Sequence, residues 1–156
     1  MKYPAVIAVL AIGMVPPTVA VAQVPREVAS HQVYVPSLGD IMGATQLRHI
    51  KLWFAGKLRN WELATYELGQ IKASFEDAAT LYPGIPITDM TIVAAPVQSL
   101  GDAIAAKDSA RFKKAFDELT VACNGCHQAI GRSFITIQVP TASPFSNQPF
   151  SLHAKP

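Results

Sequence analysis

Cysteine is scarce in this chain. Its 156 residues include only two, Cys123 and Cys126. They stand three positions apart, so a bridge between them could not close a long loop and staple the fold. A structural zinc site needs about four ligands, and the chain has no second cysteine pair to supply the rest. The sequence therefore excludes a disulfide-stapled fold and argues against a structural zinc centre.

A large excess of charge is also missing. The formal net charge is +2 at pH 7, and this small value gives no strong field to attract nucleic acid or an anionic membrane surface. Long hydrophobic runs are absent as well. The apolar run at residues 5–15 is shorter than the ~20 residues that cross a bilayer. We therefore expect no nucleic-acid partner and no membrane span in the mature chain.

The N-terminus has the three parts of an export signal. Lys2 gives a charged start, residues 5–15 form the apolar part, and Ala20–Ala22 reads A-V-A, which suits an A-x-A cleavage site. We expect residues 1–22 to be a signal peptide that is cleaved after Ala22. Export matters for the motif described next, because it decides the compartment in which that motif would be modified.

The most informative motif runs from Cys123 to His127 and reads C-N-G-C-H. C-x-x-C-H is the attachment site of c-type haem, in which both thiols add to porphyrin vinyl groups and the histidine becomes an axial iron ligand. On a helix, residues three apart share a face, so both sulfurs can reach one edge of the macrocycle. A thioredoxin-type C-x-x-C would instead follow a strand and open a helix. We therefore predict one covalent haem c on Cys123 and Cys126, with His127 on the iron.

Four segments carry apolar residues at alternating steps of three and four, which indicates helices. The links between them are short and favour antiparallel neighbours. We expect an all-α fold, an antiparallel four-helix bundle over residues 37–132, preceded by an N-terminal extension at 23–36. The predicted helices run from Leu38 to Gly56, from Trp61 to Ala78, from Val93 to Ile104 and from Phe112 to Ile130.

Polar residues and one glycine mark the expected helix ends. Pro96 is expected to kink the third helix. Both cysteines fall on the inner stripe of the last helix, so the haem is expected inside the bundle near one end. The expected caps are Ser37, Asn60, Thr88 or Asp89, Asp108 or Ser109, and Gly131 at the final end.

An exported four-helix chain with C-x-x-C-H near the end of its last helix resembles the cytochrome c prime family and its low-spin relatives. The resemblance is best from Ala105 to Ile130 and covers Ser37 to Arg132 in architecture. It implies location in the bacterial periplasm and redox partner proteins there, and it allows a homodimer. Two features depart from the family: a short first link and a Pro-rich tail at residues 133–156.

The ligand opposite His127 would decide between electron transfer and gas binding. Met42 and His49 are seven residues apart on the inner stripe of the first helix, so a rise of ~1.5 Å per residue separates them by about 10 Å and only one can reach the iron. The family approaches the far face of the haem from beyond the first turns of that helix. This favours His49, with Met42 as the alternative and an open position as the third case. His31 and His153 lie outside the helical segments.

The tail carries no formally charged side chain from Ser133 to Ala154 but several apolar ones. A disordered linker usually has charge and few aromatics, so we expect the tail to pack on the bundle or across the haem edge. A docking arm for a redox partner or second subunit is the alternative. Ile135, Ile137 and Val139 alternate with polar residues, which indicates an extended, strand-like piece.

Together these features predict a periplasmic carrier of single electrons with a covalent haem. The alternative is a five-coordinate protein that binds nitric oxide or carbon monoxide, as cytochromes c prime do. An enzyme, such as a weak peroxidase, is less well supported, because no distal acid–base pair stands out in the sequence.

Overall fold

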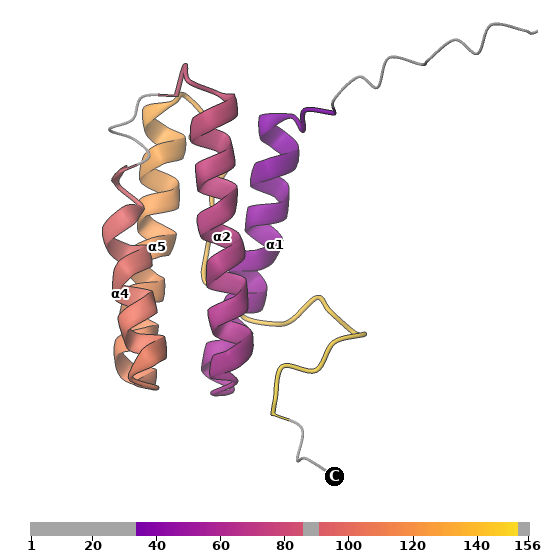
Figure 1. The fold of residues 1–156 in the computed structure, drawn as a ribbon, viewed down its shortest axis with the longest axis vertical. Coiled ribbons are helices and arrows are strands. Elements are labelled where there is room, and N and C mark those ends of the chain that lie inside the picture. The colour runs from indigo at the N-terminus through magenta and orange to yellow at the C-terminus, as the bar shows by residue number, and fades with distance from the viewer. Residues whose placement is uncertain (1–33, 86–90, 153–156) are drawn as a thin grey trace, which may run out of the picture. The chain divides into compact units, whose positions relative to one another are not determined.

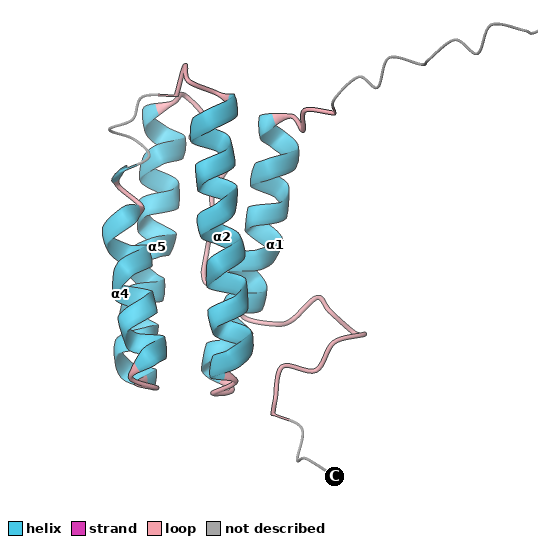
Figure 2. Cartoon of the chain, in the orientation of Figure 1, coloured by secondary structure: helices cyan, strands magenta, loops and turns pink. Residues whose placement is uncertain are grey.

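The structure is a computed structural model that describes residues 34–85 and 91–152. Over these residues it contains four helices and no strand (Figure 2). The predicted all-α class is confirmed. The expectations for the signal peptide and for Thr88, Asp89, His31 and His153 fall outside the described residues. None of the described helices combines the length and apolar character needed to cross a membrane.

Each of the four helices contacts two neighbours, so that together they form a closed ring. Helix α1 (Leu38–Lys57) contacts α2 (Trp61–Leu81) and α5 (Ser109–Ala129), and α4 (Ala94–Ala105) contacts α5 and α2. Figure 1 shows α1 and α5 running in opposite directions. This arrangement is compatible with the antiparallel four-helix bundle that the sequence predicts.

The predicted capping residues act at three helix starts. The Ser37 side chain accepts from the backbone of Asp40, whose carboxylate accepts from the Ser37 backbone, so α1 opens with a capping box. Asn60 caps α2. Of the two candidates for α5, Asp108 is the cap and accepts two backbone N–H groups. Gly131, two residues beyond α5, has φ 72°, a conformation that glycine adopts without a Cβ clash.

The third helix differs from its prediction. It begins at Ala94, and Val93 at its cap position makes no side-chain capping bond. Pro96 therefore stands in the first turn, where a backbone N–H has no intrahelical partner to lose. Residues 92–93 form a turn just before α4, so the break that the sequence predicts at Pro96 lies at the start of this helix instead of inside it.

Aromatic side chains fill the core between the end of α1, the start of α2 and the first half of α5. Phe112 and Phe116 are fully buried. Phe116 packs with its ring centroid 4.9 Å from that of Trp53, and Phe112 lies 6.0 Å from Trp61. These contacts place Trp53 in the core and the partly buried Trp61 against it, where α1 and α2 meet.

Gly56 sits where α1 passes closest to this aromatic cluster. A Cβ at this position would overlap the ring of Phe112. The ring belongs to a fully buried residue and has little room to move. The missing side chain therefore lets the end of α1 lie against Phe112.

One buried ion pair joins α1 to α2. The carboxylate of Glu67 is 1% exposed and lies 3.1 Å from Nη1 of Arg48, whose side chain is 30% exposed. Arg48 also lies over the ring of Tyr66. A buried carboxylate needs such a partner, because removing it would leave an uncompensated charge in the interior.

We expect Gly56→Ala to lower the free energy of unfolding by about 1–3 kcal/mol, because overpacking a full core forces its neighbours to move. Gly69→Ala is the matched control. Gly69 also lies inside a helix, but its Cβ would meet nothing within 4 Å. The control should gain roughly 0.5–1 kcal/mol from helix propensity. Urea unfolding of both variants measures the difference. An equal rise in the free energy of unfolding of both variants would contradict the close contact between Gly56 and Phe112.

Candidate functional site

A cavity of about 540 Å³ lies beside the C-terminal end of α5. Its walls come from α1, α2, the last turns of α5 and the chain that follows α5. Both cysteines and the histidine of the C-x-x-C-H motif line it. Further lining residues, mostly apolar or small, are Leu38, Gly39, Met42, Gly43, Thr45, Gln46, His49, Phe75, Gly84, Ile85, Val93, Ile130, Arg132, Ile135 and Ile137.

The two cysteines are half-buried on the last turns of α5. Burial, with a smaller contribution from nearby Cys126, raises the pKa of the Cys123 thiol to about 11. Cys123 is therefore a neutral thiol at pH 7. Redox-active C-x-x-C pairs depend on a lowered thiol pKa, so the surroundings of Cys123 do not suit dithiol exchange.

The ring of His127 has a defined orientation. Its Nδ1 lies 2.8 Å from the backbone oxygen of Ile135. A carbonyl oxygen only accepts hydrogen bonds, so Nδ1 carries the proton and donates. In the neutral ring Nε2 then keeps its lone pair, which is the form that ligates a metal.

His49 lies deep in the core, with 3% of its surface exposed, and also lines the cavity. Its Nε2 is 2.9 Å from Oγ1 of Thr120, and that hydroxyl donates to the backbone oxygen of Phe116. The hydroxyl has only one proton, so it must accept from Nε2–H. Burial lowers the pKa of His49 to about 4, which keeps the ring neutral at pH 7.

Met42 lies at the level of His127. The contact between His49 and Thr120 aligns α1 with the antiparallel α5. From that contact, Met42 is seven residues toward the start of α1, and His127 is seven residues toward the end of α5. Both steps cover about 10 Å in the same direction at ~1.5 Å per residue, and both residues line the cavity.

Sequence reasoning missed several residues of this site. Arg132 is the one formally charged residue among the described residues that line the cavity. Gly43 borders open space, since a Cβ there would meet nothing within 4 Å. Asn124, an intervening residue of the motif, bonds to the backbone of Ile137. The C-x-x-C-H pattern leaves position 124 open and does not extend to Gly43 or Arg132, so it gives no information about these residues.

The chain after α5 returns along the bundle without forming a strand, in the part of it that is described. Ile137 pairs with the side chain of Asn124 instead of with a neighbouring strand. Further on, Phe150 is buried, with its ring centroid 5.7 Å from that of Phe54. Ile137 and Phe150 thus contact the bundle, whereas Phe134 and Leu152 of the same tail are exposed.

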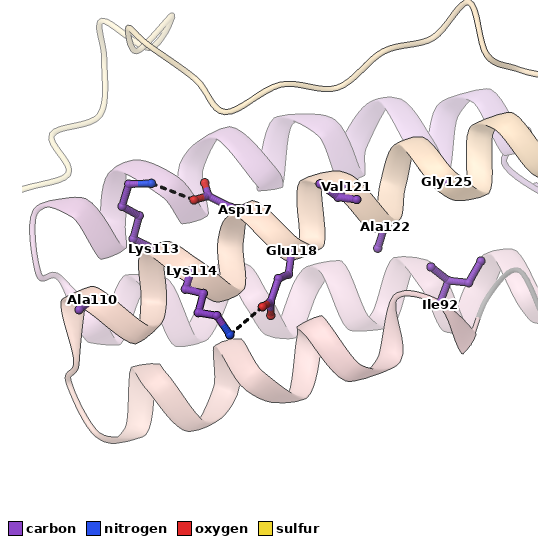
Figure 3. A pocket seen from close by; sticks show the side chains of 9 residues that line it. All are labelled: Ile92, Ala110, Lys113, Lys114, Asp117, Glu118, Val121, Ala122 and Gly125. Carbon is purple, nitrogen blue, oxygen red and sulfur yellow. Dashed lines mark hydrogen bonds and ion pairs between the residues drawn. The ribbon is translucent and has the colours of Figure 1, made fainter.

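A second hollow, of about 610 Å³, lies on the outer face of α5 (Figure 3). Two ion pairs border it, Lys113 with Asp117 and Lys114 with Glu118. These charges cancel in pairs. It contains neither cysteine nor histidine, so the chemically distinctive side chains belong to the first cavity.

No protein-family model, curated protein or solved structure matches this chain. Function is therefore inferred from the motif and from the cavity that surrounds it.

We expect His49 to make stability depend on pH. Its pKa is lowered in the folded state, so its contribution is complete above the unfolded value of about 6.5 and is lost as the pH falls toward 4. Between pH 7 and 4.5 the loss should be about 2–3 kcal/mol. His49→Gln can still donate to Thr120 but does not titrate. Urea unfolding at both pH values should show that the variant loses less free energy of unfolding than the wild type. Equal losses in the two proteins would contradict the contribution of His49 to the pH dependence.

Proposed function

We propose that this protein is a c-type cytochrome that carries single electrons through one covalent haem. One observation carries the proposal: Cys123, Cys126 and His127 all line the same apolar cavity of about 540 Å³. Cofactor pockets usually measure ~300–1,000 Å³ and are mostly apolar, with a few polar groups that fix orientation. In this proposal Cys123 and Cys126 would hold the haem through thioethers, and His127 would bind its iron.

The set of donor atoms supports a porphyrin over a bare metal ion. Within the described part of the chain, no three His, Cys, Asp or Glu side chains come together to hold a metal. A bare zinc ion would take about four protein ligands, whereas iron in a porphyrin takes only axial ligands from the chain. Arg132 lines the same cavity and suits a propionate carboxylate.

The alignment of α1 with α5 favours Met42 as the sixth ligand. Met42 stands at the level of His127, while His49 lies about 10 Å farther along α1. The Nε2 of His49 is also engaged by Thr120. We therefore propose Met42 in this role, in place of the sequence-based preference for His49. Two filled axial positions suit an electron carrier, because nothing has to bind or leave as the iron changes oxidation state.

When bound, the haem supplies a one-electron ferric–ferrous couple. The chain supplies anchorage, orientation and a dry environment. Thioethers from Cys123 and Cys126 would prevent loss of the group, and the bond from His127 to Ile135 holds the imidazole with Nε2 available. The apolar lining would limit water around a bound haem, which is one of the ways in which a protein sets a reduction potential.

The cellular setting follows from the same proposal. We infer that residues 1–22 are removed on export and that the mature chain works in the periplasm, exchanging electrons with redox partner proteins. Covalent attachment suits such a carrier, because a protein that repeatedly meets partners cannot then lose its cofactor. A homodimer is compatible with this role.

Covalent haem attachment is tested by producing the chain together with a cytochrome maturation system. We expect the purified protein to be coloured and heavier than its polypeptide by one haem. Cys123→Ser combined with Cys126→Ser should give a colourless product after denaturing extraction, because no thioether remains. A wild-type protein without bound porphyrin would overturn the proposed function.

The sixth ligand is tested by visible absorption spectra of the oxidised and reduced protein. We expect the wild type to be low-spin and unaffected by carbon monoxide. Met42→Ala should become high-spin and bind carbon monoxide, while His49→Gln, the control on the same helix face that keeps a donor to Thr120, should remain low-spin. A high-spin His49→Gln would assign the ligand to His49. A wild type that binds carbon monoxide would favour the gas-binding alternative.

A further inference from the structure

We propose that Asn124 is a positioning residue for His127, and that it acts by clamping the chain segment 132–139, here called the strap. The inference rests on the proposed function, since it concerns the residue proposed to hold the iron. Asn124 occupies one of the two intervening positions of C-x-x-C-H. In a simple reading of that motif it is a spacer, but its side chain makes the most specific contact between α5 and the strap.

The carboxamide of Asn124 engages both backbone groups of one strap residue. Its Nδ2 donates to the Ile137 oxygen at 2.8 Å, and its Oδ1 accepts from the Ile137 N–H at 2.7 Å. Such a pair of bonds reproduces the pattern between two residues in neighbouring antiparallel strands. It fixes both the distance of the strap from α5 and its register along the helix.

The same register brings a second strap residue to the histidine. Asn124 and His127 are three residues apart and share a face of α5. Ile137 and Ile135 are two residues apart, so in an extended chain they face the same side. The strap runs antiparallel to α5, and its Ile135 oxygen accepts from Nδ1 of His127 at 2.8 Å. The clamp at Asn124 thus sets the acceptor that orients the imidazole.

Other anchors hold the strap from both ends. The Arg132 N–H bonds to the His127 oxygen where the strap begins. Beyond it, Val139 packs against the hydrophobic core and Phe150 is buried. The Ile135 N–H also bonds to the Arg132 oxygen, which closes a turn at the start of the strap and holds Ile135 from one side. The Asn124 clamp holds Ile135 from the other side, through Ile137, and is the contact made by a side chain of α5 within the motif.

The consequence for the iron follows from the chemistry of the imidazole. An acceptor at Nδ1 raises the basicity of a ligating histidine and fixes its orientation. A more basic ligand stabilises the ferric state more than the ferrous state, which lowers the reduction potential. Releasing the strap should therefore raise the potential of the haem.

The test compares haem-loaded Asn124→Ala with Gln128→Ala. Gln128 is an exposed carboxamide beside His127 on the same helix. In Asn124→Ala the ratio of reduced to oxidised haem at a fixed solution potential should rise about threefold to tenfold, the range that the net strength of one hydrogen bond corresponds to. Nuclear magnetic resonance of the reduced protein should show faster exchange of the His127 Nδ1 proton. Gln128→Ala should match the wild type in both measurements.

A second variant tests the clamp from the other side. Ile137→Pro removes the N–H that donates to Asn124 and leaves Asn124 in place. If one clamp is responsible, Ile137→Pro changes the reduction potential in the same direction as Asn124→Ala. The potential of the double variant then shifts no further than that of the single variant with the larger effect. This variant also provides the answer if Asn124→Ala fails to load haem.

The outcomes separate the two proposals. A wild type without covalent haem overturns the proposed function, and the positioning role falls with it. A haem-loaded wild type whose potential and Nδ1 proton exchange are unchanged in Asn124→Ala overturns the positioning role alone. Fully additive shifts in the double variant would also overturn it, because they would mean that the two residues act separately.

Discussion

The buried hydrogen bond between His49 and Thr120 joins the middle of α1 to the middle of α5, and the geometry of the cavity depends on it. An apolar interface between two helices tolerates sliding, because hydrophobic contact has no direction. A buried polar pair does not, since a shift would leave the Nε2–H of His49 without an acceptor in the core. The pair therefore fixes the level at which Met42 faces His127, so a residue outside the proposed coordination sphere sets its alignment.

Much of the helical framework could be predicted from the sequence, because helix ends depend on local chemistry. The Ser37 capping box, the Asn60 cap and the Asp108 cap each involve residues only a few positions apart. The third helix was less predictable. Pro96 indicates a break but does not say whether a turn precedes it, and here the helix starts two residues before it.

The candidate site was predictable in its motif and in the inward positions of Met42 and His49, but not in how the two helices align. C-x-x-C-H names three residues of the cavity, whereas a choice between Met42 and His49 requires the alignment of two helices that are about seventy residues apart in sequence. The hydrophobic period indicates which face of each helix points inward, but not how far one helix is shifted along its axis relative to its neighbour. The contact of Asn124 with Ile137 could not be predicted for the same reason. Each residue belongs to a local sequence pattern, whereas the hydrogen bond joins two different segments of the chain.

One wall of the cavity is made by irregular chain instead of a helix, and this affects how a large planar group could enter. The helices are held by extensive burial, whereas the strap is held at the cavity by the contacts of Ile135 and Ile137 with two side chains of α5. Elements with few such contacts open at a lower free energy than the global unfolding of a domain. Gly131, with its left-handed backbone, marks the point where this wall leaves α5. Displacing the wall would cost less than separating the helices, so this side offers a porphyrin the easier way in while the bundle stays folded.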